Sequence, residues 1–335
     1  MIIKSITLTN FRNHDHYHLD CKDDTTLILG KNGCGKTSVL EAIYILTRGK
    51  SFRASDQDII KRETDFYRIE LINDTGEKNI VTYDGQTKSF IIMDKKTRRL
   101  PKNHKYPVIL FLPSDLNLIS GSPSRHREYF DHFFSELDEK YSSYLSKYEK
   151  TLRQRNELLK NEHVQSSDLF SWNLLLTKYG SYLHQVRENL TNRINLELEK
   201  TYFQVANHHD NLTLNYQTEI SQKNEDFYLK KLEANLDKDL YLKHTSFGVH
   251  RDDFIFYFNN KPADGSASRG ETRSIILALK FTEANMMNEL LQKKPLVLLD
   301  DVFSELDDTR RAALIKNFKH HQIILTSVED INLNY

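Results

Sequence analysis

This sequence is poor in cysteine and has no long apolar runs. Its 335 residues include only Cys21 and Cys34, which excludes a disulfide framework or a four-cysteine zinc site and fits a reducing cytosol. No apolar run approaches the roughly 20 residues that a membrane-spanning helix requires. The N-terminal "MIIKSITLTNFRNH" has neither a basic leader nor a cleavage site, so we expect no export and a cytoplasmic location.

The chain also has no net charge at neutral pH. The 47 Lys and Arg residues balance the 47 Asp and Glu residues, so the overall charge implies no nucleic-acid ligand. Any basic footprint for such a ligand must therefore be local. The length and an apolar content of 39% indicate a globular chain with a sizeable core and about two domains.

Glycine is absent from a long central stretch, where helical periodicity dominates. Between Pro123 and Lys160 there is no glycine and no further proline. Apolar side chains recur there at spacings of three and four, and they do so again from Leu176 to Ile194. We expect two antiparallel helices of about 40 residues each, joined by the polar "NEHVQSSD". A shorter helix is expected near 223–240.

Strands and helices alternate on both sides of this stretch. Residues 2–9 and 25–29 are predicted strands, a helix is expected from Lys36 to Gly49, and a hairpin should turn at Asp84-Gly85. Further strands are expected in "PVILFL", "PLVLLDD" and "QIILTS". The predicted fold class is α/β. A head made of residues 1–115 and 245–335 is split by a helical arm, a short antiparallel helix pair within residues 116–244.

A glycine-rich turn between a strand and a helix carries the first chemical motif. "GKNGCGKT" fits G-x-x-x-x-G-K-[ST], whose glycines let backbone N–H groups face phosphate oxygens at a helix N-terminus. Lys36 is expected to reach the β- and γ-phosphates of ATP, and Thr37 to ligate Mg²⁺. The predicted nucleotide-binding residues are Gly30, Lys31, Asn32, Gly33, Cys34, Gly35, Lys36, Thr37 and Ser38.

Two adjacent aspartates follow the apolar strand in "LVLLDD". Asp300 is predicted to hold Mg²⁺ through its water shell, together with Thr37. Asp301 is predicted to orient or polarise the attacking water, which makes Asp301 and Lys36 the predicted catalytic residues. The alternative is that the two aspartates cap a helix. The apolar run before them favours the end of a buried strand instead.

A third motif, "SASRGETRS", places serine and glycine directly before a helix. It resembles the signature motif of ABC-type ATPases, which points at the γ-phosphate held by another subunit, although Ser and Gly there also form an ordinary N-cap. The predicted signature residues are Ser268, Arg269, Gly270 and Glu271. The following "SELDD" matches the D-loop, with Ser304 and Asp307. These resemblances imply an ABC-type P-loop ATPase head that works as a dimer.

Several longer stretches make the resemblance more specific. They are "GKNGCGKTSVLEAIYILTRGKSFR", "LFLPSDLNLISGSPSRHREYFD", "GVHRDD", "SRGETRSIILALK" and "LLDDVFSELDDTRR". Their order and spacing resemble the RecF family of bacterial DNA replication and repair ATPases. The family usually has Gln near Arg269 and Glu271. For His250-Arg251-Asp252-Asp253 we can assign no role beyond structural support.

The RecF resemblance also implies cofactors and partners. It implies ATP and Mg²⁺, an ATP-dependent homodimer, and slow ATP hydrolysis as the switch. It implies binding of duplex DNA near single-strand/duplex junctions, help in loading recombinase at gaps, and the partners RecR and, through it, RecO. Two alternatives stay open: another SMC-like ATPase whose arm docks proteins, and a transporter ATPase, which the inserted arm and the lack of a switch histidine near Thr326 disfavour.

The densest basic cluster follows the predicted hairpin and is the candidate DNA contact. A solvated loop is an equally good interpretation. The predicted contact residues are Lys95, Lys96, Arg98 and Arg99. The next candidates are the basic residues after the phosphate-loop helix, Arg48, Lys50 and Arg53. The alternating His14, His16 and His18 are expected to be exposed polar residues at a sheet edge rather than metal ligands.

Overall fold

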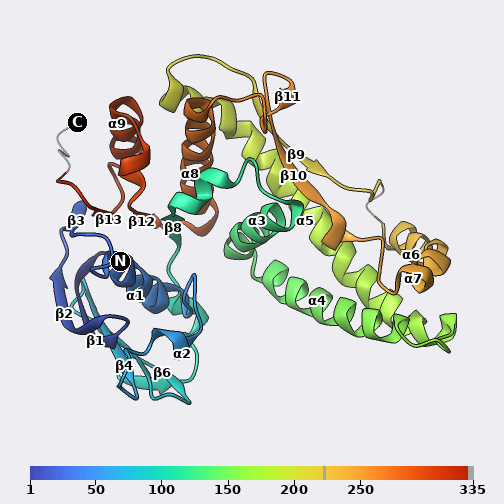
Figure 1. The fold of residues 1–335 in the computed structure, drawn as a ribbon, viewed down its shortest axis with the longest axis horizontal. Helices are drawn as coiled ribbons and strands as arrows, with labels where there is room; N and C mark the ends of the chain where they lie inside the picture. Colours follow the sequence, from blue (N-terminus) through green and yellow to red (C-terminus); the bar gives the residue numbers. More distant parts are fainter. Residues whose placement is uncertain (222–223, 331–335) are drawn as a thin grey trace. The chain divides into compact units, whose positions relative to one another are not determined.

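The structure is a computed structural model that describes residues 1–221 and 224–330. The chain forms two compact units, which can be followed by colour in Figure 1. The head unit joins Met1–Leu116 to the segment from Glu283 onward, and the arm unit is Asn117–Thr282. An insertion thus divides the head unit into two segments of the chain.

The three-part division predicted from the sequence differs from these units in one respect. Residues 245–282 were assigned to the head, but they cluster with the arm unit. The reason is that β10 (Asp253–Phe258) pairs along its whole length with β9 (Leu212–Gln217). The division into ATPase head and helical arm stays a prediction about domains.

The head unit contains a four-stranded parallel sheet with the order β3-β13-β12-β8. The strands are β3 (Thr25–Leu29), β8 (Val108–Phe111), β12 (Leu296–Asp300) and β13 (Ile323–Ser327). The two central strands, β12 and β13, are buried at every position, as expected for parallel strands covered on both faces. Because parallel strands end at one edge of a sheet, β3 and β12 deliver the phosphate-loop sequence and Asp300 to the same edge.

A six-stranded antiparallel sheet with the order β2-β1-β4-β5-β6-β7 completes the head unit. Its strands are β1 (Ile3–Phe11), β2 (His14–Asp20), β4 (Tyr67–Asn73), β5 (Lys78–Tyr83), β6 (Lys88–Ile92) and β7 (Lys95–Thr97). The sequence predicted only a small sheet around the Asp84-Gly85 turn. That turn is confirmed, with φ 84° at Gly85, but β1 and β2 extend the sheet through pairing of β1 with β4.

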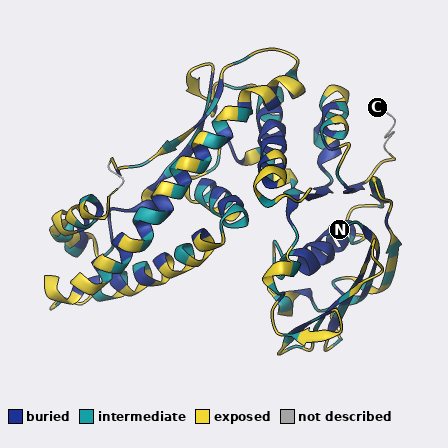
Figure 2. Ribbon diagram, turned by 180° about the vertical axis from the view of Figure 1, so that it is seen from behind, coloured by how far each residue is buried: buried dark blue, intermediate teal, exposed yellow. Residues whose placement is uncertain are grey.

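Helix α1 (Lys36–Arg48) supplies much of the core of the head unit, and Figure 2 shows it as mostly buried. Its predicted end is confirmed, since Gly49 has φ 87° and donates its N–H to the carbonyl of Ile45. The remaining short elements of this unit are α2 (Asp56–Ile59), η1 (Lys102–His104), η2 (Pro113–Asn117), which crosses the unit boundary, η4 (Val302–Glu305) and α9 (Asp308–Asn317).

Three helices dominate the arm unit: α3 (Pro123–Leu137), α4 (Glu139–Leu159) and α5 (Ser166–Ala206). The expected second long helix is confirmed as the 41-residue α5, and α4 lies beside it in both ribbon views (Figures 1 and 2). The expectation of one continuous first helix was wrong. The chain breaks at Asp138, whose carboxylate caps α4 by accepting the N–H groups of Lys140 at 2.8 Å and Tyr141 at 3.0 Å.

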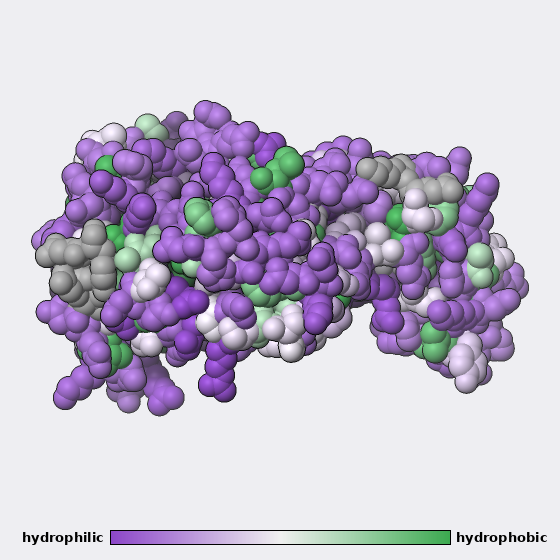
Figure 3. All heavy atoms as spheres, turned by 90° about the horizontal axis from the view of Figure 1, so that it is seen from above, coloured by the Kyte–Doolittle hydropathy of each residue, from purple (hydrophilic) through white to green (hydrophobic). Residues whose placement is uncertain are grey.

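The rest of the arm unit consists of short elements and the start of α8. They are α6 (Glu225–Ala234), α7 (Leu236–Leu242), η3 (Val249–Arg251), β11 (Lys261–Pro262) and α8 (Arg269–Leu291), within which the unit boundary falls. The predicted helix near 223–240 is therefore two helices, divided at Asn235, and its predicted start at 223 lies outside the described residues. Among the described residues no helix is long and apolar enough to cross a membrane, and hydrophilic residues cover most of the face in Figure 3.

Candidate functional site

The glycine-rich turn forms a tight loop between β3 and α1. Gly33 and Gly35 have φ angles of 82° and 102°, which L side chains rarely adopt. Gly30 lies so close to Cys34 that an added Cβ would fall 2.4 Å from its Sγ. The glycines at these three positions therefore meet real steric needs of the loop.

The ammonium group of Lys36 is held inside this loop. The side chain is only 7% exposed, and its Nζ donates hydrogen bonds to the carbonyls of Gly30 at 2.7 Å and Lys31 at 3.2 Å. These carbonyls keep the cation beside the start of α1, where helix N–H groups also point. A phosphate group entering the loop would meet both kinds of positive potential.

The hydroxyl of Thr37 lies against the carboxylate of Asp300. Thr37 Oγ1 donates to Oδ1 at 2.8 Å and is 2.9 Å from Oδ2, and Thr326 Oγ1 donates to Oδ1 at 2.9 Å. Asp300 is buried, with 9% of its surface exposed. The sheet therefore places two oxygen donors predicted for Mg²⁺ side by side, although 263 positions of sequence separate them.

Asp301 has an unusual backbone and an unused carboxylate oxygen. Its φ of 53° lies in the left-handed region, and its N–H donates to Thr326 Oγ1 at 2.9 Å. Its Oδ1 is shielded from solvent and accepts no hydrogen bond from any described residue. Backbone strain combined with an unsatisfied buried polar atom is typical of functional positions.

A cavity of about 690 Å³ joins the phosphate loop, Asp300 and Asp301. Two arginines that also line it, Arg12 and Arg53, converge on the fully buried Glu41 of α1. Arg12 donates to both carboxylate oxygens, at 2.7 and 2.9 Å, and Arg53 donates twice to Oε2, at 2.9 and 3.1 Å. Burial alone raises the pKa of Glu41, but hydrogen bonds from Arg12, Arg53 and Ser51 outweigh it and leave that pKa below its ordinary value.

Sequence reasoning gave no role to Arg12 or Glu41 and treated Arg53 only as an alternative DNA contact. The short stretches that contain them, "LTNFRNH" and "GKSFR", were visible but carry no general chemical pattern. What brings them together is the fold: Arg12 directly follows β1, Glu41 lies in α1, and Arg53 follows α1 in the chain. Because Arg53 also lies 3.5 Å from Ser38 Oγ, its guanidinium belongs to the surroundings of the loop.

Asn13, directly before β2, and His14, its first residue, support the phosphate loop. Asn13 Nδ2 donates to the carbonyl of Gly33 at 3.2 Å, and His14 Nε2 lies 3.2 Å from the carbonyl oxygen of Gly35. His16 and His18 are exposed on the same edge strand. Among the described residues no group of three or more His, Cys, Asp or Glu side chains could hold a metal ion.

The predicted signature motif forms a capping box at the start of α8. Ser268 N donates to Glu271 Oε2 at 2.6 Å, and Glu271 N donates to Ser268 Oγ at 3.3 Å. Glu271 therefore has a local structural role. Ser268, Arg269, Gly270 and Glu271 belong to the arm unit, so their contact with a nucleotide stays a prediction.

The D-loop residues also have local partners. Ser304 Oγ donates to the carbonyl of Asp301 at 2.7 Å, and Asp307 caps α9 by accepting the N–H of Arg310 at 2.9 Å. The first bond ties the D-loop directly to the residue predicted to act on water. Contact of these residues with another subunit stays a prediction.

The predicted DNA contacts lie at and beside the edge strand β7. Their side chains are exposed at all four positions, Lys95, Lys96, Arg98 and Arg99. Successive residues of a strand point to opposite faces, so Lys95 and Lys96 do not share one face. Of the alternative set, Arg48 donates to the carbonyl of Tyr106 at 3.1 Å and Arg53 is engaged by Glu41.

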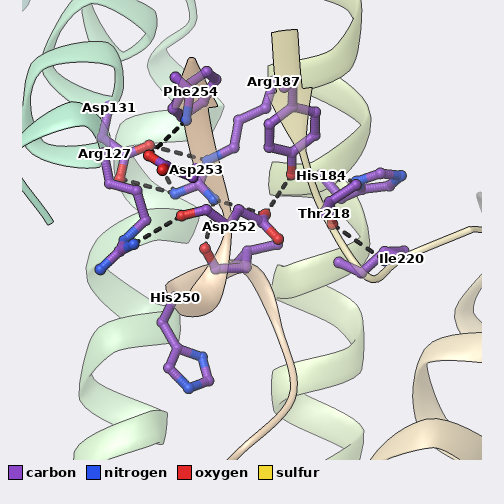
Figure 4. Close-up of polar contacts among 12 residues, drawn as sticks. Arg127, Asp131, His184, Arg187, Thr218, Ile220, His250, Asp252, Asp253 and Phe254 are labelled. Carbon is purple, nitrogen blue, oxygen red and sulfur yellow. Dashed lines mark hydrogen bonds and ion pairs between the residues drawn. The ribbon is translucent and has the colours of Figure 1, made fainter. Parts of the chain in front are cut away.

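The stretch His250-Arg251-Asp252-Asp253 takes part in a buried polar network of the arm unit (Figure 4). Arg187 donates to Asp131 at 2.8 and 2.9 Å and to Asp252 Oδ2 at 3.0 Å, and the Tyr216 hydroxyl also bonds Asp252. His250 is buried, which lowers its pKa to about 4 and keeps it neutral. These contacts agree with the structural role predicted for the stretch.

Comparisons with known proteins found a family model and curated relatives that match this chain. A family model described as AAA ATPase domain matches residues 1–239. The "DNA replication and repair protein RecF" of Clostridioides difficile is 33% identical to this chain, over 98% of the chain and 92% of that relative.

Solved structures similar to this chain were also found. The "recombination mediator protein RecF-ATPrS in RecFOR pathway" superposes with a TM-score of 0.88 at 29% identity, over 98% of this chain and 92% of that one. An Smc head bound to the C-winged helix domain of ScpA has a TM-score of 0.53 at 15% identity, over 98% and 90% of the two chains, which shows likeness of fold alone.

Proposed function

Because this chain belongs to the RecF family of DNA replication and repair proteins, we propose that ATP closes two copies of it into a dimer on duplex DNA near single-strand gaps. The chain is an ATPase that binds ATP. In the proposed cycle slow hydrolysis reopens the dimer. The dimer helps to load recombinase in the cytoplasm, with RecR, and RecO through it, as partners.

The observation that best supports this proposal is the contact between the phosphate loop and the end of β12. Lys36 is held by two loop carbonyls, and these bonds can be exchanged for bonds to β- and γ-phosphate oxygens when ATP enters. At the same edge the Thr37 hydroxyl is hydrogen-bonded to the Asp300 carboxylate. The cation and the oxygen donors therefore surround the position that phosphates of a nucleotide would take.

The Thr37 hydroxyl and the Asp300 carboxylate are suitable ligands for Mg²⁺. A hydroxyl and a carboxylate are hard oxygen ligands, and Mg²⁺ is usually held by one or two protein groups together with substrate phosphates and water. We infer that Thr37 binds the ion directly and that Asp300 binds it through water. When bound, Mg²⁺ neutralises negative charge on the β- and γ-phosphates.

Asp301 is the proposed catalytic carboxylate. The Thr326 hydroxyl holds its backbone N–H, and the left-handed backbone turns the chain directly after β12. The unpartnered Oδ1 can accept a hydrogen bond from the attacking water and polarise it. Ser304 bonds the carbonyl of Asp301, so a change in the D-loop would be felt at this residue.

The proposed dimer needs the signature residues of one copy at the γ-phosphate of the other. The capping box of Ser268 and Glu271 supports this role, because it orders the N-terminal turn of α8 and leaves the positive end of a 23-residue helix there. The carboxylate of Glu271 accepts the N–H of Ser268 and brings its negative charge to this helix N-terminus.

The experiment that tests the proposed function is a measurement of molar mass by light scattering. The protein is compared with ATP, with ADP and without nucleotide, each without DNA, with gapped duplex DNA and with intact duplex DNA. We expect a dimer with ATP, stabilised by the gapped DNA, and a monomer otherwise. Unchanged mass in all conditions would contradict the dimer, and the same dimer mass with intact duplex as with gapped DNA would contradict the preference for gaps.

A further inference from the structure

The head unit has a second cavity, of about 1010 Å³, at the edge of the parallel sheet where the strands begin. Its walls include Asp24, directly before β3, and Gln322, directly before β13. Leu296, at the start of β12, also lines it. The nucleotide cavity lies at the other edge, where the strands end, and the two cavities share no lining residue.

The walls of this groove are held together by specific hydrogen bonds. Gln322 is 7% exposed; its amide exchanges two hydrogen bonds with the backbone of Ile3, at 2.7 and 2.8 Å, and donates to the carbonyl of Lys22 at 2.8 Å. The hydroxyl of Tyr106 donates to the carbonyl of Lys294 at 2.8 Å. Segments far apart in the sequence are thereby fixed as one preformed surface.

The lysines that line the groove outnumber its aspartates by four to three, so the groove has a small excess of positive charge. It is lined by four exposed lysines that make no ion pair with any described carboxylate, namely Lys22, Lys293, Lys294 and Lys319. Of the three aspartates that line it, Asp23 forms an ion pair, whereas Asp24 and Asp74 accept backbone N–H groups and keep their negative charge. Asp23 pairs with Lys4 at 2.5 Å, Asp24 accepts the N–H of Thr25 at 2.6 Å, and Asp74 accepts the N–H of Ile2 at 3.0 Å.

Helix stabilisation explains only part of this pattern. Lysines after α8 and α9 lie at the negative ends of those helix dipoles. Lys22 follows a strand and has no such role.

We propose that this groove docks an extended, acidic peptide segment of a partner protein. Acidic side chains of such a segment would meet the four unpaired lysines, and its backbone amides would offer hydrogen bonds to the walls. A nucleic-acid strand fits less well, because a phosphate at every nucleotide would also face Asp23, Asp24 and Asp74. A peptide can place neutral residues opposite those aspartates. The proposal is independent of the ATP and DNA sites.

The test uses the full-length protein and a short fluorescein-labelled peptide rich in glutamate, followed by fluorescence anisotropy. The double variant Lys293→Glu/Lys294→Glu reverses two charges of the groove. Lys316→Glu is the matched control, since Lys316 is an exposed lysine of α9 that does not line the groove. We expect the double variant to bind the peptide at least about tenfold more weakly than wild type, and the control to bind within about twofold.

Two further measurements make the result decisive. ATP affinity should be unchanged in both variants, which shows that the head unit is intact. A peptide with glutamine in place of glutamate should bind weakly to all three proteins. Equal binding of the acidic peptide to wild type and the double variant would overturn the proposal. So would a single-stranded oligonucleotide that loses binding in the double variant while the peptide does not.

Discussion

Alanine in place of Gly35 should damage the phosphate loop much more than alanine in place of Gly33. Both positions have positive φ, so alanine costs about 1–2 kcal/mol of backbone strain at either one. An added Cβ at Gly33 meets no heavy atom within 4 Å. At Gly35 it falls 2.3 Å from His14 Nε2 and 2.5 Å from Asn13 Oδ1.

These contacts force His14 and Asn13 away from the loop. Their bonds to the loop carbonyls are lost, at about 0.5–1.5 kcal/mol each. Gly35→Ala should therefore cost about 1–3 kcal/mol more than Gly33→Ala. For a unit of this size, that difference corresponds to a melting temperature at least about 2 °C lower.

The assay is differential scanning calorimetry of the nucleotide-free proteins, so that phosphate contacts do not contribute. Adding Asn13→Ala and His14→Ala to the Gly35→Ala variant should cost little more, because the bonds of these two side chains are already lost there. The same two substitutions in the Gly33→Ala background should not stabilise it. Equal melting temperatures for Gly33→Ala and Gly35→Ala would refute the supporting role assigned to Asn13 and His14.

The remaining predictions concern the proposed cycle. Lys36→Met should abolish ATP binding and ATP-driven dimerisation together, since the ammonium inside the loop is lost; tight binding by calorimetry would show that the loop is not the site. Asp301→Asn should keep ATP binding but slow hydrolysis and prolong the dimer, because the amide polarises water less well; wild-type phosphate release would exclude a catalytic role. Ser268→Arg should block dimerisation while the monomer still binds ATP, since the side chain would enter the space for a partner's γ-phosphate; an intact ATP-dependent dimer would rule out the proposed sandwich. If roughly four basic side chains near β7 meet phosphates, they contribute about −3.6 to the slope of log K against log salt, at about −0.9 per contact. A variant with serine at all four positions should show a flatter salt dependence of DNA binding and an unchanged ATP affinity; the positions are Lys95, Lys96, Arg98 and Arg99. An unaltered salt dependence would show that DNA binds elsewhere.

The sequence by itself determined the local structure of the phosphate loop. Glycine spacing predicted the turn between β3 and α1, and Gly49 predicted where α1 ends. An apolar run predicted β12, with Asp300 and Asp301 at its end. These features could be predicted because backbone angles, caps and burial patterns depend mainly on residues within a few positions of one another.

Only the tertiary structure decided what surrounds the loop. Arg12, Glu41 and Arg53 meet because β1 and the segment after α1 flank one cavity, and no spacing in the sequence encodes that meeting. The break at Asp138 was also missed, since the apolar period continues across it while the Asp138 carboxylate caps the start of a new helix. Likewise, the order of strands in the sheet brings Thr37 to Asp300 across 263 positions. Contacts of this kind depend on how whole elements pack, so the chain defines them only once it has folded.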